Sequence, residues 1–255
     1  MDSFYEQLDE GRFRATPRTA GPWSDKAQHL GPVSALLARE LERCQPREDL
    51  AIRRVAVDVL GPVPVDELEV TAQVLRPGRS VELVAAELSA GGRAAATARA
   101  WRMVRGDTGP QAGGGPAPLA DPGSWPELPV LDGWSTGYAA AVEWRFAEGT
   151  EPGRAQVWAR ARIPLLPDEE PSGLQRVLTI ADSASGVSSR LDMREWMFIN
   201  TDLTIHLHRE PAGEWVGMDA STAIGPDGAG TGTSALHDAS GPVGRGEQAL
   251  LVTPR

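Results

Sequence analysis

The stretch AQHLGPVSALLARELERC, residues 27–44, is the segment from which the fold can be worked out. Apolar residues recur in it at three- and four-residue spacing, at Leu30, Val33, Leu37 and Leu41. That spacing is typical of an amphipathic helix with one face in a core. A second stretch in the other half of the chain, SGLQRVLTIADSAS at residues 172–185, has the same periodicity, with Ser172 as a suitable N-cap. The sequence therefore predicts one long helix in each half.

Strand-like runs surround both predicted helices in the same order. In the first half an extended stretch precedes the helix and four runs follow it, at residues 12–16, 52–60, 68–76, 81–89 and 94–103. In the second half the corresponding runs lie at residues 156–163, 197–208, 215–224, 231–237 and 248–252. A single strand–helix–four-strand unit cannot cover both its sheet and its helix, so a duplicate supplies the missing partner. We predict an α+β fold, a double hotdog, in which two central helices are wrapped by one continuous antiparallel sheet.

A change of composition divides the two predicted repeats. Residues 106–130 are rich in Gly, Pro and Ala and almost free of periodic apolar residues, which is typical of a linker. We therefore predict an N-terminal repeat at residues 1–105 and a C-terminal repeat at residues 131–255. The linker is expected to run over the surface.

Composition excludes several classes of protein. The 255 residues are 41% hydrophobic, enough for a sizeable core, and the formal net charge of -10 argues against nucleic-acid binding. The single cysteine, Cys44, leaves no internal disulfide, as expected in a reducing compartment. The N-terminus lacks the pattern of a signal peptide, and no run reaches the ~18 apolar residues of a membrane span. These features predict a cytoplasmic protein.

Three motifs together resemble one enzyme family. The segment HLGPVSALL at residues 29–37 is similar to the first-helix signature of medium-chain acyl-CoA thioesterases of the double-hotdog type. Asp202, followed six residues later by His208-Arg209, resembles that family's second-repeat strand, and Gln248 resembles a third family position. The resemblance implies hydrolysis of an acyl-CoA to free acid and CoA by an activated water. It implies no cofactor and no covalent acyl-enzyme.

Asp182 is the candidate catalytic carboxylate. When the two helices are aligned by their apolar positions, Val33 falls opposite Leu174, and Asp182 falls opposite Leu41. Burying a carboxylate near a core-facing stripe costs free energy unless the group is paired or has a catalytic role. Asp182 is therefore interpreted as a base beside a thioester carbonyl. The alternative is a helix-end carboxylate that caps the nearby serines. The resemblance favours catalysis, because the family's catalytic aspartate occupies the matching helix position.

Gln248 and either Asn200 or Thr201 complete the predicted water site. Gln248 stands in an otherwise apolar last strand, where its amide offers both a donor and an acceptor to a water. A solvent-facing glutamine is the alternative. The third ligand is open: the family has Ser or Thr at the position of Asn200, whereas strand alternation favours Thr201.

An electrophilic site for the thioester oxygen is expected at the start of the second helix. The backbone N–H groups of Gly173 and Leu174 lie there, at the positive end of the helix dipole. No metal site is expected, because His206 and His208 share a strand face without a carboxylate or cysteine set to complete the ligands.

Two other functions fit the same fold. One is a non-catalytic protein that binds acyl-CoA or an acyl chain. The presence of Asn200 in place of the family's hydroxyl residue would be compatible with this function. The other is an enoyl-CoA hydratase, whose chemistry needs an Asp–His pair; His29 reaches Asp182 only if the fold brings them together. The expected partner of the leading function is an acyl-CoA substrate. Since the chain carries its own second hotdog, we expect a monomeric double hotdog or a homodimer.

Overall fold

One antiparallel sheet runs through both halves of the molecule. The structure, a computed structural model, describes residues 2–128 and 136–255. Within these ranges the strands form a 13-stranded sheet in the order β1-β2-β4-β5-β6-β3-β10-β13-β12-β11-β8-β7, with β9 paired to β13 beside this path. The strands are β1 (Tyr5–Asp9), β2 (Arg12–Ala15), β3 (Leu50–Val59), β4 (Glu67–Arg76), β5 (Val81–Ala90), β6 (Arg93–Val104), β7 (Val142–Phe146), β8 (Arg154–Ala161), β9 (Trp196–Asn200), β10 (Asp202–Leu207), β11 (Val216–Ile224), β12 (Ala229–Asp238) and β13 (Gly241–Pro254).

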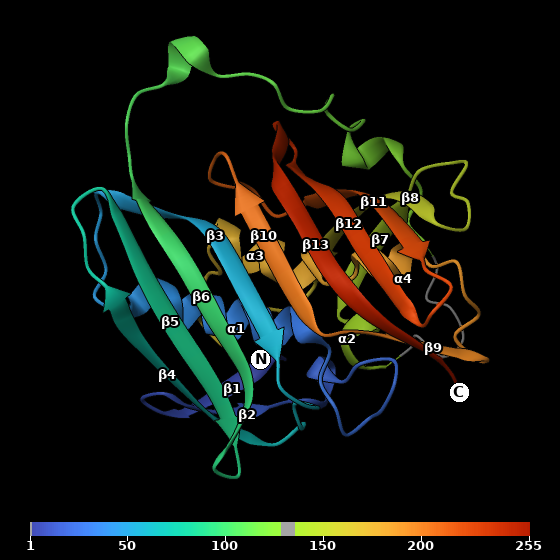
Figure 1. Cartoon of the computed structure of the whole chain (residues 1–255), viewed down its shortest axis with the longest axis horizontal. Coiled ribbons are helices and arrows are strands. Elements are labelled where there is room, and N and C mark those ends of the chain that lie inside the picture. Colours follow the sequence, from blue (N-terminus) through green and yellow to red (C-terminus); the bar gives the residue numbers. More distant parts are fainter. Residues whose placement is uncertain (1, 129–135) are drawn as a thin grey trace.

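The two repeats meet at β3 and β10. These strands pair antiparallel, with Val57 opposite Leu203 and Val55 opposite Ile205, and all four side chains are buried. The sheet therefore continues from one repeat into the other, as Figure 1 shows. The predicted double hotdog is confirmed.

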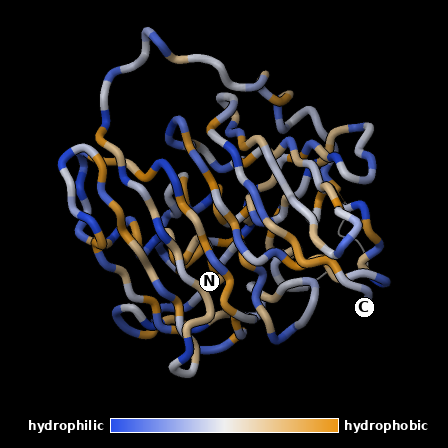
Figure 2. Tube along the Cα trace, viewed as in Figure 1, coloured by the Kyte–Doolittle hydropathy of each residue, from blue (hydrophilic) through white to orange (hydrophobic). Residues whose placement is uncertain are grey.

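The helices lie on one side of this sheet. They are α1 (Leu30–Arg43), α2 (Gly137–Ala140), α3 (Gly173–Ala181) and α4 (Ala184–Val187), with short 3-10 turns η1 (Pro17–Thr19), η2 (Gly109–Gln111) and η3 (Pro122–Ser124). No helix among the described residues is long and apolar enough to cross a membrane. Figure 1 shows α1 and α3 behind the strands, and Figure 2 shows hydrophobic residues alternating with hydrophilic ones along the strands. The core fills the space between the helices and the inner face of the sheet.

Glycine sets how closely α1 and α3 approach. A Cβ on Gly31 would lie 2.2 Å from the backbone oxygen of Thr179, nearer than any real side chain comes. The first turn of α1 therefore lies directly against the last turn of α3. This contact brings the start of one helix to the end of the other.

The structure corrects several predicted boundaries. Two short strands, β1 and β7, lie at the ends of the sheet and were not predicted, since five residues give little periodicity. The predicted run at residues 197–208 is divided into β9 and β10. The last strand begins at Gly241 and not at residue 248, because its glycine-rich first half lacks the apolar pattern that marks a strand.

The described part of the linker is attached to the second repeat. It leaves β6 and passes over the top of the view in Figure 1. Trp158 Nε1 donates a hydrogen bond to the Ala120 oxygen (2.8 Å), and Arg145 donates to the oxygen of Pro122 (3.2 Å). The predicted first residue of the second repeat, Leu131, lies outside the described residues.

Candidate active site

Four polar side chains from four different elements converge at one point, which we call the Asp182 cluster. Asp182 ends α3, Gln248 lies in β13, Asn200 ends β9, and His29 is the N-cap of α1. Asn200 Nδ2 donates to Asp182 Oδ1 at 2.8 Å, and Gln248 Nε2 donates to the same oxygen at 3.0 Å. His29 Nδ1 lies 2.9 Å from Asp182 Oδ2. The structure thus brings the predicted Asp182, Gln248 and Asn200 together.

Gln248 is held rigidly in this cluster. Its side chain is buried, and Nε2 also donates to the backbone oxygen of Asp182 at 2.9 Å, while Oε1 accepts from the Ser185 N–H at 3.3 Å. Opposite it, Gly232 leaves room for this amide, since a Cβ there would lie 2.9 Å from Gln248 Oε1 and 3.1 Å from Ser185 Cβ. The amide is therefore a fixed part of the site and does not face solvent.

A bulge decides between Asn200 and Thr201. Asn200 pairs with Leu250 of β13, whereas Thr204 pairs with Glu247, so the β9–β10 side contains one extra residue. Asp202 Oδ1 fixes this irregularity by accepting the Ala249 N–H at 2.8 Å. The extra residue breaks the alternation of faces. Asn200 therefore reaches Asp182, while Thr201 is exposed and stands outside the Asp182 cluster.

His29 is the member of the cluster that sequence reasoning did not assign. Its Nδ1 lies near two groups, the Asp182 carboxylate at 2.9 Å and the Gly31 N–H at 3.1 Å, and one nitrogen can serve only one of them. The carboxylate is charged and nearer, so we assign the proton to Nδ1 as a donor to Asp182. The first turn of α1, the positive end of its dipole, lies against the end of α3 that carries this carboxylate. The motif at residues 29–37 marks His29, but only the packing of α1 on α3 brings it to Asp182.

Gly173 and Leu174, the predicted oxyanion donors, lie at the opposite end of α3 from Asp182. Gly173 and Leu174 begin the helix and Asp182 follows its last turn, nine residues later, or roughly 13 Å along the axis. Moreover, a Cβ on Gly173 would lie 2.0 Å from the Pro211 oxygen, so this end is packed closely by backbone. The helix that begins beside Asp182 is α1, because the two helices run in opposite directions.

Sequence comparison assigns both halves of the chain to one family. Residues 19–103 match the profile described as the acyl-CoA thioesterase N-terminal domain, and residues 114–252 match that of the acyl-CoA thioesterase C-terminal domain. The chain belongs to the acyl-CoA thioesterase family. A comparison with curated proteins gave no significant match.

Solved structures share the fold of this acyl-CoA thioesterase family member at low identity. A proposed thioesterase II from Thermobifida fusca YX is 18% identical, with 98% of this chain and 95% of that chain covered and a TM-score of 0.78. A hotdog protein of unknown function from Alicyclobacillus acidocaldarius is 12% identical, with 97% and 95% covered and a TM-score of 0.76. The acyl-CoA thioesterase II TesB2 from Mycobacterium marinum is 18% identical, with 98% and 95% covered and a TM-score of 0.69. These similarities support the double-hotdog fold.

Three of the four residues of the Asp182 cluster come from the second repeat of this thioesterase family member, and the first repeat has apolar residues at the equivalent positions. The first repeat has a bulge at the same place, between Ile52 and Arg54 of β3. Before this bulge Ile52 pairs with Arg102 of β6, just as Asn200 pairs with Leu250 of β13 in the second repeat. Ile52 and Ala100 therefore stand where the second repeat has Asn200 and Gln248, and Leu41 stands where it has Asp182. All three replacements are apolar, so within residues 2–128 and 136–255 the duplicated scaffold retains one candidate site of this kind.

A half-buried carboxylate occupies the related position between the other two helix ends. Glu42, one residue after Leu41, accepts hydrogen bonds from Ser172 Oγ at 2.8 Å and Gln175 Nε2 at 2.7 Å. Burial raises the pKa of Glu42, and the two hydrogen bonds oppose that rise. The start of α3 is thus already filled by a group of the protein itself.

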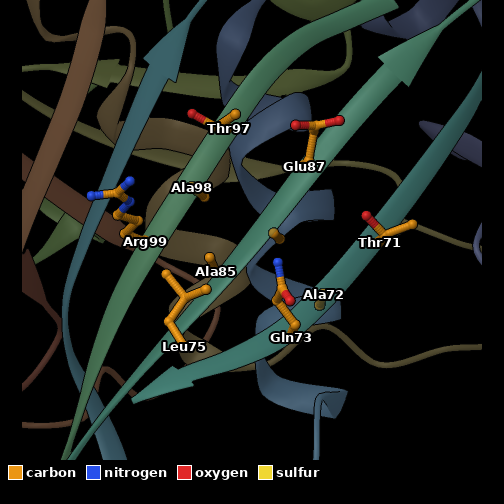
Figure 3. A pocket seen from close by; sticks show the side chains of 10 residues that line it. Thr71, Ala72, Gln73, Leu75, Ala85, Glu87, Thr97, Ala98 and Arg99 are labelled. Atoms are coloured by element: carbon orange, nitrogen blue, oxygen red, sulfur yellow. The ribbon is translucent and has the colours of Figure 1, made fainter. Parts of the chain in front are cut away.

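Two hollows of the surface lie away from the Asp182 cluster. Figure 3 shows one on the sheet face turned away from α1, where Ala85 on β5 leaves a shallow trough between longer side chains. It is lined by Thr71, Gln73, Leu75, Glu87, Thr97 and Arg99, among others. The second lies between the linker and strands β8 and β11, beside Gln156 and Asp219. Neither contains a residue of the Asp182 cluster.

The chemistry of the cluster is that of a fixed carboxylate. Among the described residues no group of three or more His, Cys, Asp or Glu side chains is placed to hold a metal ion. The Asp182 carboxylate is nearly buried, at 4% side-chain exposure, and three side chains donate to it. Such a group can accept a proton from a water held in a defined place.

Proposed function

We propose that this protein hydrolyses acyl-CoA thioesters to free acid and CoA, with Asp182 as the base that activates water. The observation that supports this most is the number of hydrogen bonds that Asp182 accepts. Oδ1 accepts two amide N–H groups and Oδ2 accepts one from His29, which leaves one of about four lone-pair positions for a water proton. The free position is on Oδ2.

The proposed reaction uses the remaining lone pairs of the cluster. A water donates one hydrogen to Asp182 Oδ2 and the other to the carbonyl oxygen of Gln248, which keeps one lone pair after accepting from Ser185. As its oxygen bonds to the thioester carbon, its proton passes to Asp182. The C–S bond then breaks, and CoA leaves as a thiol after the proton is returned from Asp182 to sulfur.

The developing charge on the thioester oxygen needs donors near Asp182. With Nδ1 of His29 donating to Asp182, the Gly31 N–H is released for this task, at the positive end of the α1 dipole. We therefore propose the start of α1 as the oxyanion site, in place of Gly173 and Leu174.

One observation favours a second reaction. The contact between His29 and Asp182 supplies the Asp–His pair that an enoyl-CoA hydratase uses to add water across a carbon–carbon double bond. The family assignment favours hydrolysis, and the two amides on Oδ1 leave a lone pair of Oδ2 to accept a proton from the water. Both reactions can be measured on the same protein.

A panel of acyl-CoAs from short to long chain, with a thiol-reporting dye, tests the proposal. We expect CoA release on at least one chain length, and we expect Asp182→Asn to lower kcat by roughly 10²–10⁴-fold with little change in KM. Asp219→Asn, a change of the same kind on the far face of β11, should leave kcat unchanged. Loss of enoyl-CoA absorbance without thiol release would establish the hydratase instead.

A protein that shows neither thioester hydrolysis nor hydration would point to a different function. If acyl-CoAs bind by calorimetry but neither thiol nor hydrated product forms, the protein is a non-catalytic acyl-CoA binder. The proposal of a thioesterase would then be wrong.

A further inference from the structure

The imidazole of His29 lies flat against the ring of Tyr138. The two ring centroids are 3.9 Å apart, with an angle of 13° between the ring planes. Tyr138 belongs to α2, in the second repeat, whereas His29 begins α1 in the first. Tyr138 is buried, with 3% of the residue exposed. One face of the imidazole is therefore covered by an aromatic ring from the other half of the chain.

The hydroxyl of the same tyrosine reaches the helix end that carries Asp182. It donates to the Thr179 oxygen at 2.8 Å and lies 3.0 Å from Ser183 Oγ. These two residues flank Asp182 in sequence. Burial raises the pKa of Tyr138, so the hydroxyl keeps its proton and remains a donor. A single side chain thus contacts His29 directly and, through Thr179 and Ser183, the helix end that carries Asp182.

Tyr138 is itself fixed by the backbone of the first repeat. Its N–H donates to the Ala20 oxygen at 2.9 Å. Gly137 before it has a φ of +65°, and a Cβ there would lie 2.5 Å from the same oxygen, so both the conformation and the contact require glycine. Trp144 meets the Tyr138 ring edge-on, with centroids 6.3 Å apart. The ring therefore has little freedom to turn.

We propose that Tyr138 is a positioning residue for His29. Its ring sets the plane of the imidazole so that Nδ1–H faces Asp182, and its hydroxyl holds the end of α3 at the distance this hydrogen bond requires. The structural part stands on these contacts alone, whereas its effect on turnover rests on the proposed function. A histidine without such support is free to place its proton on either nitrogen and to rotate away.

NMR of the full chain labelled with ¹⁵N-histidine shows which imidazole nitrogen of His29 carries the proton. The chain has four histidines, and His29→Asn identifies the His29 signals by their loss. In the native protein we expect His29 to carry its proton on Nδ1. Tyr138→Leu should abolish that signature, Tyr138→Phe should keep it, and Tyr5→Phe, which removes the other buried tyrosine hydroxyl, should leave it unchanged.

Two results would overturn the proposal. One is a native His29 protonated on Nε2, which needs no variant and so remains decisive if Tyr138→Leu does not fold. The other is a folded Tyr138→Leu protein whose His29 spectrum matches the native one.

Kinetic measurements on the Tyr138 variants distinguish a failure of the positioning role from a failure of the proposed function. If hydrolysis is found, we expect Tyr138→Leu to lower kcat by roughly 10²-fold, as displacement of a catalytic group by about 1 Å does, while KM changes little. Tyr138→Phe should retain most of the activity. If the native protein shows no hydrolysis but the His29 signature depends on Tyr138, the proposed function fails and the positioning role stands.

Discussion

The carboxylate of Asp182 accepts hydrogen bonds from side chains of three other elements, and each donor has its own structural cause. His29 reaches it because the first turn of α1 packs against the end of α3, and Gln248 because Gly232 leaves space. Asn200 reaches it because of the bulge between β9 and β10. The placement of the Asn200 amide thus depends on the one extra residue at the bulge between β9 and β10.

Substitution of the two neighbours at the bulge tests this placement. Asn200→Ala removes a hydrogen bond to a charged group, worth about 1.5–3 kcal/mol, so we expect kcat to fall by roughly 10- to 100-fold. Thr201→Ala changes an exposed side chain and should leave kcat unaltered. Steady-state kinetics on both variants decides the matter. Loss of activity in Thr201→Ala alone would show that the face assignment is wrong.

At the scale of elements, the antiparallel contact of α1 with α3 creates two polar junctions. At one, the start of α1 meets the end of α3 at Asp182, and at the other the start of α3 meets Glu42. The closeness of the first junction depends on Gly31.

Gly31→Ala should separate these helices. Its Cβ would collide with backbone, which cannot rotate away as a side chain can, so we expect the free energy of unfolding to fall by about 1–3 kcal/mol. Turnover should fall as well, since His29 moves with the first turn of α1. Gly61→Ala is the matched control, because its Cβ meets nothing within 4 Å. Equal melting temperatures for the two variants in calorimetry would refute the close contact.

The second junction predicts a pH-dependent stability. Burial raises the pKa of folded Glu42 above its unfolded value of about 4.3, so the ionised form destabilises the fold once the pH exceeds the raised pKa. Glu42→Gln should therefore raise the melting temperature near pH 8. The gain should shrink as the pH falls through the raised pKa toward 4, where Glu42 itself becomes neutral.

Calorimetry across this pH range, with the exposed Glu48→Gln as control, measures the effect. A gain for Glu42→Gln that stays constant with pH would assign it to packing and not to charge.

At the scale of the whole molecule, each repeat supplies what the other lacks. The two helices cover one another, β3 pairs with β10, and Tyr138 of the second repeat covers His29 of the first. The division into repeats at residues 1–105 and 131–255 remains a prediction, as does the assembly state. The four residues of the Asp182 cluster are supplied by a single chain, two of them from strands and two from helix ends.

We therefore predict that a monomer is sufficient for a complete core. Size-exclusion chromatography with light scattering should show a folded species with the mass of one chain at low concentration. A homodimer that keeps its circular dichroism spectrum on dissociation would agree with this prediction. An assembly that unfolds when it dissociates would contradict it.

The sequence by itself determined the architecture and part of the site. Periodicity in residues 27–44 and 172–185, and strand runs in a repeated order, required a helix and a sheet in each half, since these patterns are local. Asp182 and Gln248 could be singled out because a polar group at an otherwise apolar position is visible in one dimension.

Only the tertiary structure decided which groups meet. His29 and Asp182 lie in different repeats, and their contact depends on the approach of α1 to α3 at Gly31. Asn200 was placed beside Asp182, and Thr201 away from it, by a bulge that reverses the expected faces, and the antiparallel packing of the two helices put the start of α1 beside Asp182. The physical reason is the same in each case: the local pattern fixes what a segment forms, whereas packing between distant segments fixes what its side chains touch.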